Sequence, residues 1–186
     1  MSASPSGAGS SMHRKQGTSG RLPIGVSNFN CAQIEHLATE TGVWPAVNEL
    51  EYHPWVSAQA HELVSWCLLK QIVVIAYGSL GGSKNTGQRS AIVAEVAKRH
   101  SVNNAHVLLL RWALQRGVAV IPGATSRAHI ADNMALSRAA PLSLHLSDDE
   151  MKMIETSVVP GRFKTWKSLC TESANSAPSE ACRPSV

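Results

Sequence analysis

Short apolar runs alternate with segments of helical periodicity along the middle of this chain. The runs predict strands near residues 23–26, 46–51, 72–77 and 118–121, because parallel strands that are buried on both faces read as almost continuous apolar sequence. Apolar positions at helical spacing predict helices through Ile34 and Ala38, from 57 to 68, over 90–99, 104–115 and 126–137, and from 147. This alternation predicts an α/β fold, with a parallel sheet that holds the four strands in chain order and helices on its outer face.

Polar residues mark where some of these helices begin. Asn28 or Asn30 is expected to cap the first helix, and Ser126 the fifth. Ser147 and Glu150 have the spacing of a capping box before the last helix. Outside the patterned region, Ser- and Gly-rich residues 1–20 and polar residues 168–186 are expected to be flexible, which leaves 21–167 as one folded domain.

Composition narrows the classes of protein. The 186 residues carry a formal net charge of +4, but the Lys and Arg residues are scattered, which argues against nucleic-acid binding. No apolar stretch reaches the ~18–20 residues of a membrane-spanning helix, so no membrane partner is expected. The first residues lack the apolar segment of a secretory signal, and a cytoplasmic location is expected. The histidines show no metal-ligand spacing; His53 is expected to be structural, and His61, His100 and His106 to lie on exposed helix faces.

Four motifs carry a family resemblance. They are IGVSNF at 24–29, PAVNELEYHP at 45–54, VIAYGSLG at 74–81 and LLRWALQRGVAVIP at 109–122. In this order they resemble consecutive signatures of the aldo-keto reductases, over about residues 20–158. The resemblance implies a (β/α)8 TIM barrel that binds a nicotinamide dinucleotide, NADP or NAD, at the carboxyl ends of its strands.

Only strands five to eight of that barrel are matched, so the chain is expected to form the C-terminal half-barrel. The family's catalytic Asp, Tyr, Lys and His lie on the first four units, and no catalytic residue is therefore assigned here. The resemblance implies an oxidoreductase that reduces aldehydes or ketones with NAD(P)H. The alternative is a catalytically inactive half-barrel that binds a nucleotide or a protein, or a truncated gene product. Two open sheet edges also predict self-association.

The resemblance assigns the nicotinamide end of the cofactor to strand ends. Ser27 and Asn28 correspond to the pair that bonds the carboxamide, and Glu49 stands where the family often has Gln. Tyr77 corresponds to the aromatic residue that stacks on the nicotinamide ring, and Leu80 to a position beside the pyrophosphate. From the residues alone, Ser27 and Asn28 also fit an ordinary helix cap, Glu49 a solvated charge, and Tyr77 a packing residue.

At the adenosine end the sequence departs from the family pattern. Gly123 replaces a Lys that holds the 2′-phosphate of NADP, and His129 replaces a later Arg. Ser126 and Arg127, at a predicted helix start, remain as phosphate-binding candidates, because free backbone N–H groups there attract anions. Asp132 and Asn133 match positions near the adenine, although a solvated helix face explains them almost as well. Cofactor binding is therefore expected to be weak, with little preference for NADP over NAD.

Overall fold

A four-stranded parallel sheet forms the centre of the molecule. The computed structural model describes residues 22–81, 90–137 and 144–157. The strands are β1 (Gly25–Ser27), β2 (Val47–Glu51), β3 (Val73–Tyr77) and β4 (Ala119–Val120), in the spatial order β1-β2-β3-β4 and parallel throughout. The predicted strands, their order and their direction are confirmed. The expected flexible segments, 1–20 and 168–186, lie outside the described residues.

Six helices in the described residues follow the predicted periodicity. They are α1 (Cys31–Thr41), α2 (Ala58–Leu69), α3 (Ala91–Arg99), α4 (Ala105–Gln115), α5 (Arg127–Ser137) and α6 (Asp148–Thr156). Asn30, not Asn28, caps α1, and it forms a capping box with Gln33. Ser147 and Glu150 form the predicted capping box of α6. None of the helices described is long and apolar enough to span a membrane.

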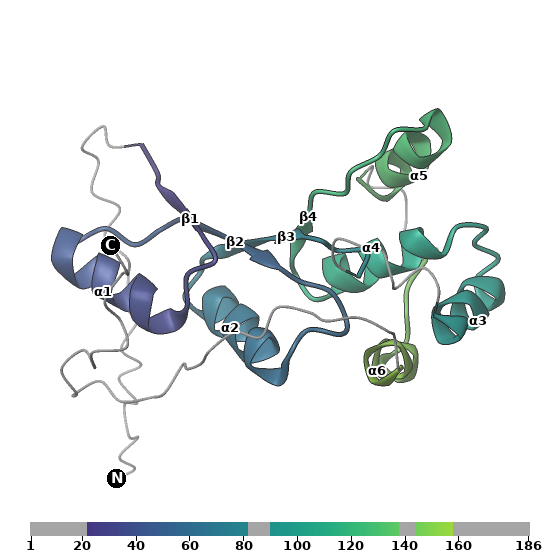
Figure 1. The fold of residues 1–186 in the computed structure, drawn as a ribbon, viewed down its shortest axis with the longest axis horizontal. Helices are drawn as coiled ribbons and strands as arrows, with labels where there is room; N and C mark the ends of the chain where they lie inside the picture. Colours follow the sequence, from purple (N-terminus) through teal and green to yellow (C-terminus); the bar gives the residue numbers. More distant parts are fainter. Residues whose placement is uncertain (1–21, 82–89, 138–143, 158–186) are drawn as a thin grey trace, which may run out of the picture.

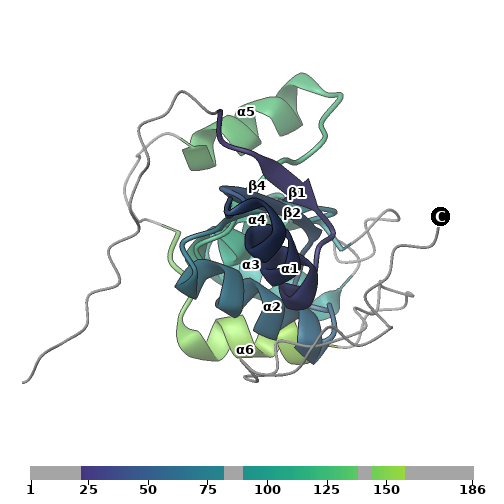
Figure 2. The ribbon, with the colours of Figure 1, turned by 90° about the vertical axis from the view of Figure 1, so that its left-hand side faces the viewer.

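The core lies between the sheet and the helices. Leu50, Val74 and Ala76 point from β2 and β3 into it, and α4 contributes Leu109 and Trp112. Figure 2 shows α1, α2 and α6 together on this side of the sheet. Alternation along each strand therefore sends the intervening side chains to the opposite face.

That opposite face is largely open among the described residues. Val73 on β3 is 50% exposed, and Ile121, just after β4, is 51% exposed. Ile75 and Tyr77 are half-buried. Parallel sheets are normally covered on both faces. The described part thus has the form of a half-barrel, with its outer face packed and its inner face open.

The sequence predicts α5 on the outer face of the sheet with the other helices, and this prediction is wrong. In Figures 1 and 2 it lies on the other side of the sheet, beyond β4, and it contacts α4. Its apolar side chains Ile130 and Met134 are about half exposed. The segment from Ile121 to Ser126 carries the chain away from the sheet, and Pro122 in it cannot extend a ladder of strand hydrogen bonds.

Candidate functional site

Polar side chains meet where β1 and β3 end. The Tyr77 hydroxyl donates a hydrogen bond of 2.8 Å to Oδ1 of Asn28. Nδ2 of Asn28 donates to Oγ of Ser27 at 3.0 Å, and that hydroxyl donates to the backbone oxygen of Glu49 at 3.3 Å. We call Ser27, Asn28 and Tyr77 the strand-end triad. The structure thus brings together three residues that the family resemblance had assigned to the nicotinamide.

An uncommon backbone conformation holds Asn28 in place. Its φ of 60° lies in the left-handed region, which Asn tolerates better than most residues do. Its backbone N–H donates to the backbone oxygen of Glu49 at 2.9 Å, so the turn after β1 is bonded to the middle of β2. Because Asn30 caps α1, the helix-cap explanation of Asn28 is wrong, and its side chain serves the triad instead.

Asn48, on β2, holds the loop that follows Asn28. Its role was not predicted from the sequence. The side chain is fully buried, and Nδ2 donates a hydrogen bond of 2.8 Å to the backbone oxygen of Phe29. β2 reads VNELE, so Asn48 is one of three polar residues in the strand and its burial leaves no distinct signal in the sequence. Asn48 therefore fixes the loop that carries Asn28.

The triad has the donors and acceptors that a carboxamide requires. Within the described residues, Asn28 uses one of its two N–H groups and one of the two lone pairs of its oxygen. One donor and one acceptor remain, and both Ser27 and Asn28 are exposed. A primary amide needs one acceptor for its N–H and one donor for its C=O. The residues present fit the nicotinamide group on these grounds.

Glu49 lies beside the triad in the sheet, and Leu80 follows Tyr77 closely in the chain. Glu49 pairs in register with Ser27 on one side and Ile75 on the other, and it is half-buried. Leu80 follows β3 and packs against the core. Its side chain is therefore structural here, and only its backbone is left for the role beside the pyrophosphate.

The four adenosine-end candidates gather separately, around α5. Ser126 Oγ accepts a hydrogen bond of 3.2 Å from the backbone N–H of His129, which is a capping contact, and Arg127 is exposed. The carboxylate of Asp132 accepts a hydrogen bond from Nδ2 of Asn104 and so braces α5 on α4. Asn133 is half-buried beside an apolar pocket of about 420 Å³ between α4 and α5.

The same contact between α4 and α5 corrects an expectation about histidines. His106 is only 5% exposed, not on an open helix face, and its ring meets that of His129 with centroids 4.9 Å apart. Burial lowers the pKa of His106, the charge of His129 lowers it further, and Asp132 opposes the shift. The exposed position had been predicted because the sequence of α4 does not show that α5 covers it.

A buried aromatic cluster supports β2 near its carboxyl end. The Tyr52 hydroxyl lies 3.0 Å from Nδ1 of His61, which is half-buried, and the Tyr52 ring packs on Trp112. Burial raises the pKa of Tyr52 well above its ordinary value. His53 is fully buried, and burial lowers its pKa to about 4. Neutral aromatic groups therefore underlie this part of the sheet.

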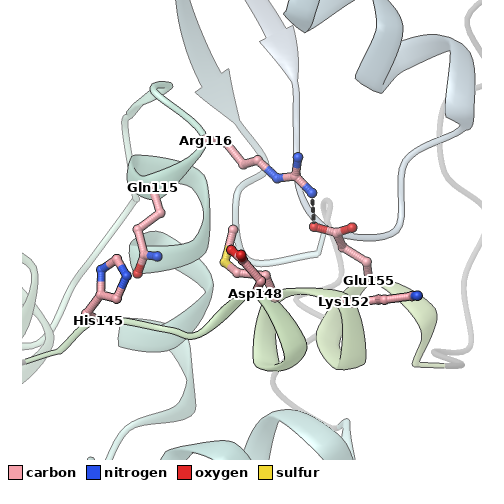
Figure 3. Close-up of a pocket in the computed structure, with 7 residues that line it drawn as sticks. Gln115, Arg116, His145, Asp148, Lys152 and Glu155 are labelled. Carbon is pink, nitrogen blue, oxygen red and sulfur yellow. Dashed lines mark hydrogen bonds and ion pairs between the residues drawn. The ribbon is translucent and has the colours of Figure 1, made fainter.

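A second pocket, of about 570 Å³, lies between the end of α4 and α6. Figure 3 shows its lining residues, including the ion pair between Arg116 and Glu155. Glu155 also accepts a hydrogen bond of 2.8 Å from the Trp112 indole. Because α4 leads directly into the start of β4, this pocket lies near the amino end of the sheet. It is separate from the strand-end triad.

In the described ranges, no group of three or more His, Cys, Asp or Glu side chains is arranged to hold a metal ion.

Comparisons with known proteins match the described part of the chain. The model of the aldo/keto reductase family matches residues 22–158. The NADPH-dependent aldose reductase GRE3 of Saccharomyces cerevisiae is 31% identical over 158 residues, which cover 77% of this chain and 46% of that protein. The aldo-keto reductase family 1 member A1-A of Danio rerio is 34% identical and covers 72% of this chain and 41% of its own length.

Solved structures agree with the sequence comparisons. A mutant of Gox0644 in complex with NADPH superposes with a TM-score of 0.61 at 29% identity, covering 72% of this chain and 45% of that one. The aldose reductase from Schistosoma japonicum has the same TM-score at 30% identity, with 72% and 40% covered. The chain spans less than half the length of these relatives.

Proposed function

The chain belongs to the aldo/keto reductase family, and we propose that it binds the nicotinamide end of NAD(P) through the strand-end triad. The hydrogen-bonded link from Ser27 through Asn28 to Tyr77 is the observation that carries this proposal. Ser27 and Asn28 hold the carboxamide, and the half-buried ring of Tyr77 lies against the nicotinamide. Glu49 borders the same site, and the backbone at Leu80 borders the pyrophosphate.

The dinucleotide, when bound, supplies a hydride to the carbonyl carbon of an aldehyde or ketone. This chain's own residues orient the nicotinamide so that one face of its ring is presented to that carbon. Asn28 does so through the two carboxamide contacts, which fix the rotation of the ring. The Tyr77 hydroxyl keeps the Asn28 side chain from turning, because it bonds Oδ1.

At the adenosine end, we propose that Ser126 and Arg127 bind the phosphate. Asp132 and Asn133 then lie beside the adenine. The first turn of α5 supports the phosphate contact, because free backbone N–H groups at a helix N-terminus attract anions. Gly123 has no side chain and supplies no charge, so binding is proposed to be weak, with little discrimination between NADP and NAD. The proposal further takes 21–167 as the folded unit and the cytoplasm as its location.

We also propose that the 186-residue chain by itself does not turn over a carbonyl substrate. The resemblance assigns the proton-donating group to units that this sequence does not match, and orientation of a hydride donor alone leaves the carbonyl oxygen unprotonated. The test is oxidation of NADPH by the purified chain with a reactive aldehyde. No turnover is expected, and turnover at a rate above the uncatalysed one would refute this part.

Binding is tested directly by calorimetric titration of the purified chain with NADPH and NADH. Weak but saturable binding is expected, and Asn28→Ala should abolish the part contributed by the nicotinamide. If neither NADPH nor NADH binds at millimolar concentration, the proposal is refuted.

The open face of the sheet supports self-association. The edge strands β1 and β4 of the described sheet, with the exposed Val73 and Ile121, would otherwise meet water. We propose that two copies pair through these edges. Sedimentation velocity at increasing concentration should show a dimer that grows at the expense of monomer. A monomer that persists at all concentrations and melts cooperatively would contradict it.

A further inference from the structure

Glu49 places a carboxylate beside the strand-end triad. Its chain neighbours Asn48 and Leu50 are buried on the side that the helices cover, so alternation along β2 puts Glu49 on the open face. Its register partners are Ser27 on β1 and Ile75 on β3, and Tyr77 follows Ile75 by two residues on the same face. Glu49 therefore lies between the two strands that carry the triad.

The charge of this carboxylate is not balanced by a neighbour. In the part of the chain that the structure describes, Glu49 forms no ion pair, whereas Glu95 and Glu155 each pair with an arginine. A glutamate carboxylate is ionised at neutral pH. Because Glu49 is half-buried, its field is screened less than that of a fully exposed group.

The two forms of a nicotinamide ring differ by one charge. The oxidised ring is a cation, and the dihydronicotinamide ring formed by hydride addition is neutral. A nearby uncompensated carboxylate attracts the first and is indifferent to the second. An amide side chain of the same shape would make the same contacts without this preference.

We propose that Glu49 makes the site select the oxidised, cationic form of the nicotinamide dinucleotide over the reduced form. The inference rests on the proposed function, since it requires the nicotinamide to lie at the triad. Selective binding of the oxidised form also lowers the reduction potential of the bound couple, and a tenfold preference corresponds to about 30 mV for two electrons. The site thereby favours hydride donation by the bound reduced form more than a site with an amide at this position would.

Calorimetric titration of the full chain with NAD⁺ and NADH gives the ratio of their two dissociation constants. The wild-type protein is expected to bind NAD⁺ more tightly, and Glu49→Gln to shift the ratio toward NADH by about tenfold. Glu40→Gln, on the exposed surface of α1, removes the same charge away from the site and should leave the ratio unchanged. Circular dichroism establishes that each variant is folded.

A second measurement does not depend on any variant. Raising the ionic strength should reduce the wild-type preference for NAD⁺, because salt screens the carboxylate. If both forms bind and the ratio changes with neither Glu49→Gln nor salt, the inference is overturned and the proposed function stands. If neither form binds, the proposed function itself fails.

Discussion

Tyr77 and Asn28, which are 49 positions apart in the chain, are joined by a hydrogen bond of 2.8 Å from the phenol to the Oδ1 atom. This bond connects the ends of β3 and β1 across β2, which lies between them. Within the described residues, Asn28 retains one further donor and one further acceptor, and it is exposed. The packing of the sheet therefore determines the geometry of the triad.

Tyr77→Phe should weaken cofactor binding while keeping the ring. The variant loses one hydrogen bond of about 1 kcal/mol, which corresponds to about a fivefold increase in the dissociation constant for NADH. Titration calorimetry measures this change. Ser65→Ala removes a hydroxyl that bonds the backbone of α2 away from the triad, and it should have no effect on affinity. Equal affinities for wild type and Tyr77→Phe would show that Asn28 does not need this restraint.

Asn48→Ala should destabilise the fold. The variant leaves the oxygen of Phe29 without its buried donor, which costs about 1–3 kcal/mol of the free energy of unfolding. Urea denaturation followed by circular dichroism gives the change in midpoint. Asn103→Ala, at an exposed position, serves as the control and should change the midpoint little. A midpoint equal to that of the wild type would mean that the loop after β1 does not depend on Asn48.

The free energy of unfolding should decrease as the pH is lowered from about 6.5 to 4, partly because of His53. Burial lowers its pKa from 6.5 to about 4, with a smaller contribution from His61, so the native state holds His53 neutral. In that window the unfolded chain binds the extra proton, and the neutral ring's contribution to stability is lost as the pH falls. The slope from one such group is at most about 1.4 kcal/mol per pH unit.

His53→Asn removes this titration and keeps an acceptor for the backbone N–H of Trp55, which now donates to Nδ1 at 3.3 Å. The variant should therefore show a shallower decline in unfolding free energy over the same window. His36→Asn, at an exposed position on α1, should retain the wild-type slope. Identical slopes for wild type and His53→Asn would contradict the assignment.

Gly123→Lys should raise the affinity for NADP relative to NAD. A Cβ at Gly123 would meet nothing within 4 Å, so a side chain can be added without a clash. A charge-assisted contact with the 2′-phosphate is worth about 1.5–3 kcal/mol, and we expect at least a tenfold gain for NADP and little change for NAD. Titration with both cofactors, repeated at higher salt, measures it. An equal gain for both would indicate a general electrostatic effect.

The sequence was sufficient to locate the strands, because short apolar runs are typical of parallel strands. It did not give their burial, since one face of β3 is open and its Val73 is 50% exposed. β3 reads VVIAY, and its apolar character and length identify a parallel strand without any tertiary information. The position of α5 was not predictable in this way. Its placement depends on the path from Ile121 to Ser126 and on a contact with α4, and neither leaves a periodic signal. The burial of His106 was missed for the same reason.

The candidate site was predicted unevenly. Ser27, Asn28 and Tyr77 were found through motif resemblance, and the structure adds the hydrogen bonds that join them. Asn48 was missed, because its role depends on a long-range bond to Phe29 that spacing does not reveal. Asp132 was assigned to the adenine from its position, whereas the structure also shows it bonded to Asn104.

The central claim is that the strand-end triad holds a nicotinamide, and titration with nicotinamide mononucleotide tests it most directly, because this ligand lacks the adenosine end. Saturable binding to the wild-type chain is expected, with at least a fivefold loss in Asn28→Ala and no loss in Arg127→Ala. Binding that is insensitive to Asn28→Ala, or lost in Arg127→Ala instead, would contradict the account.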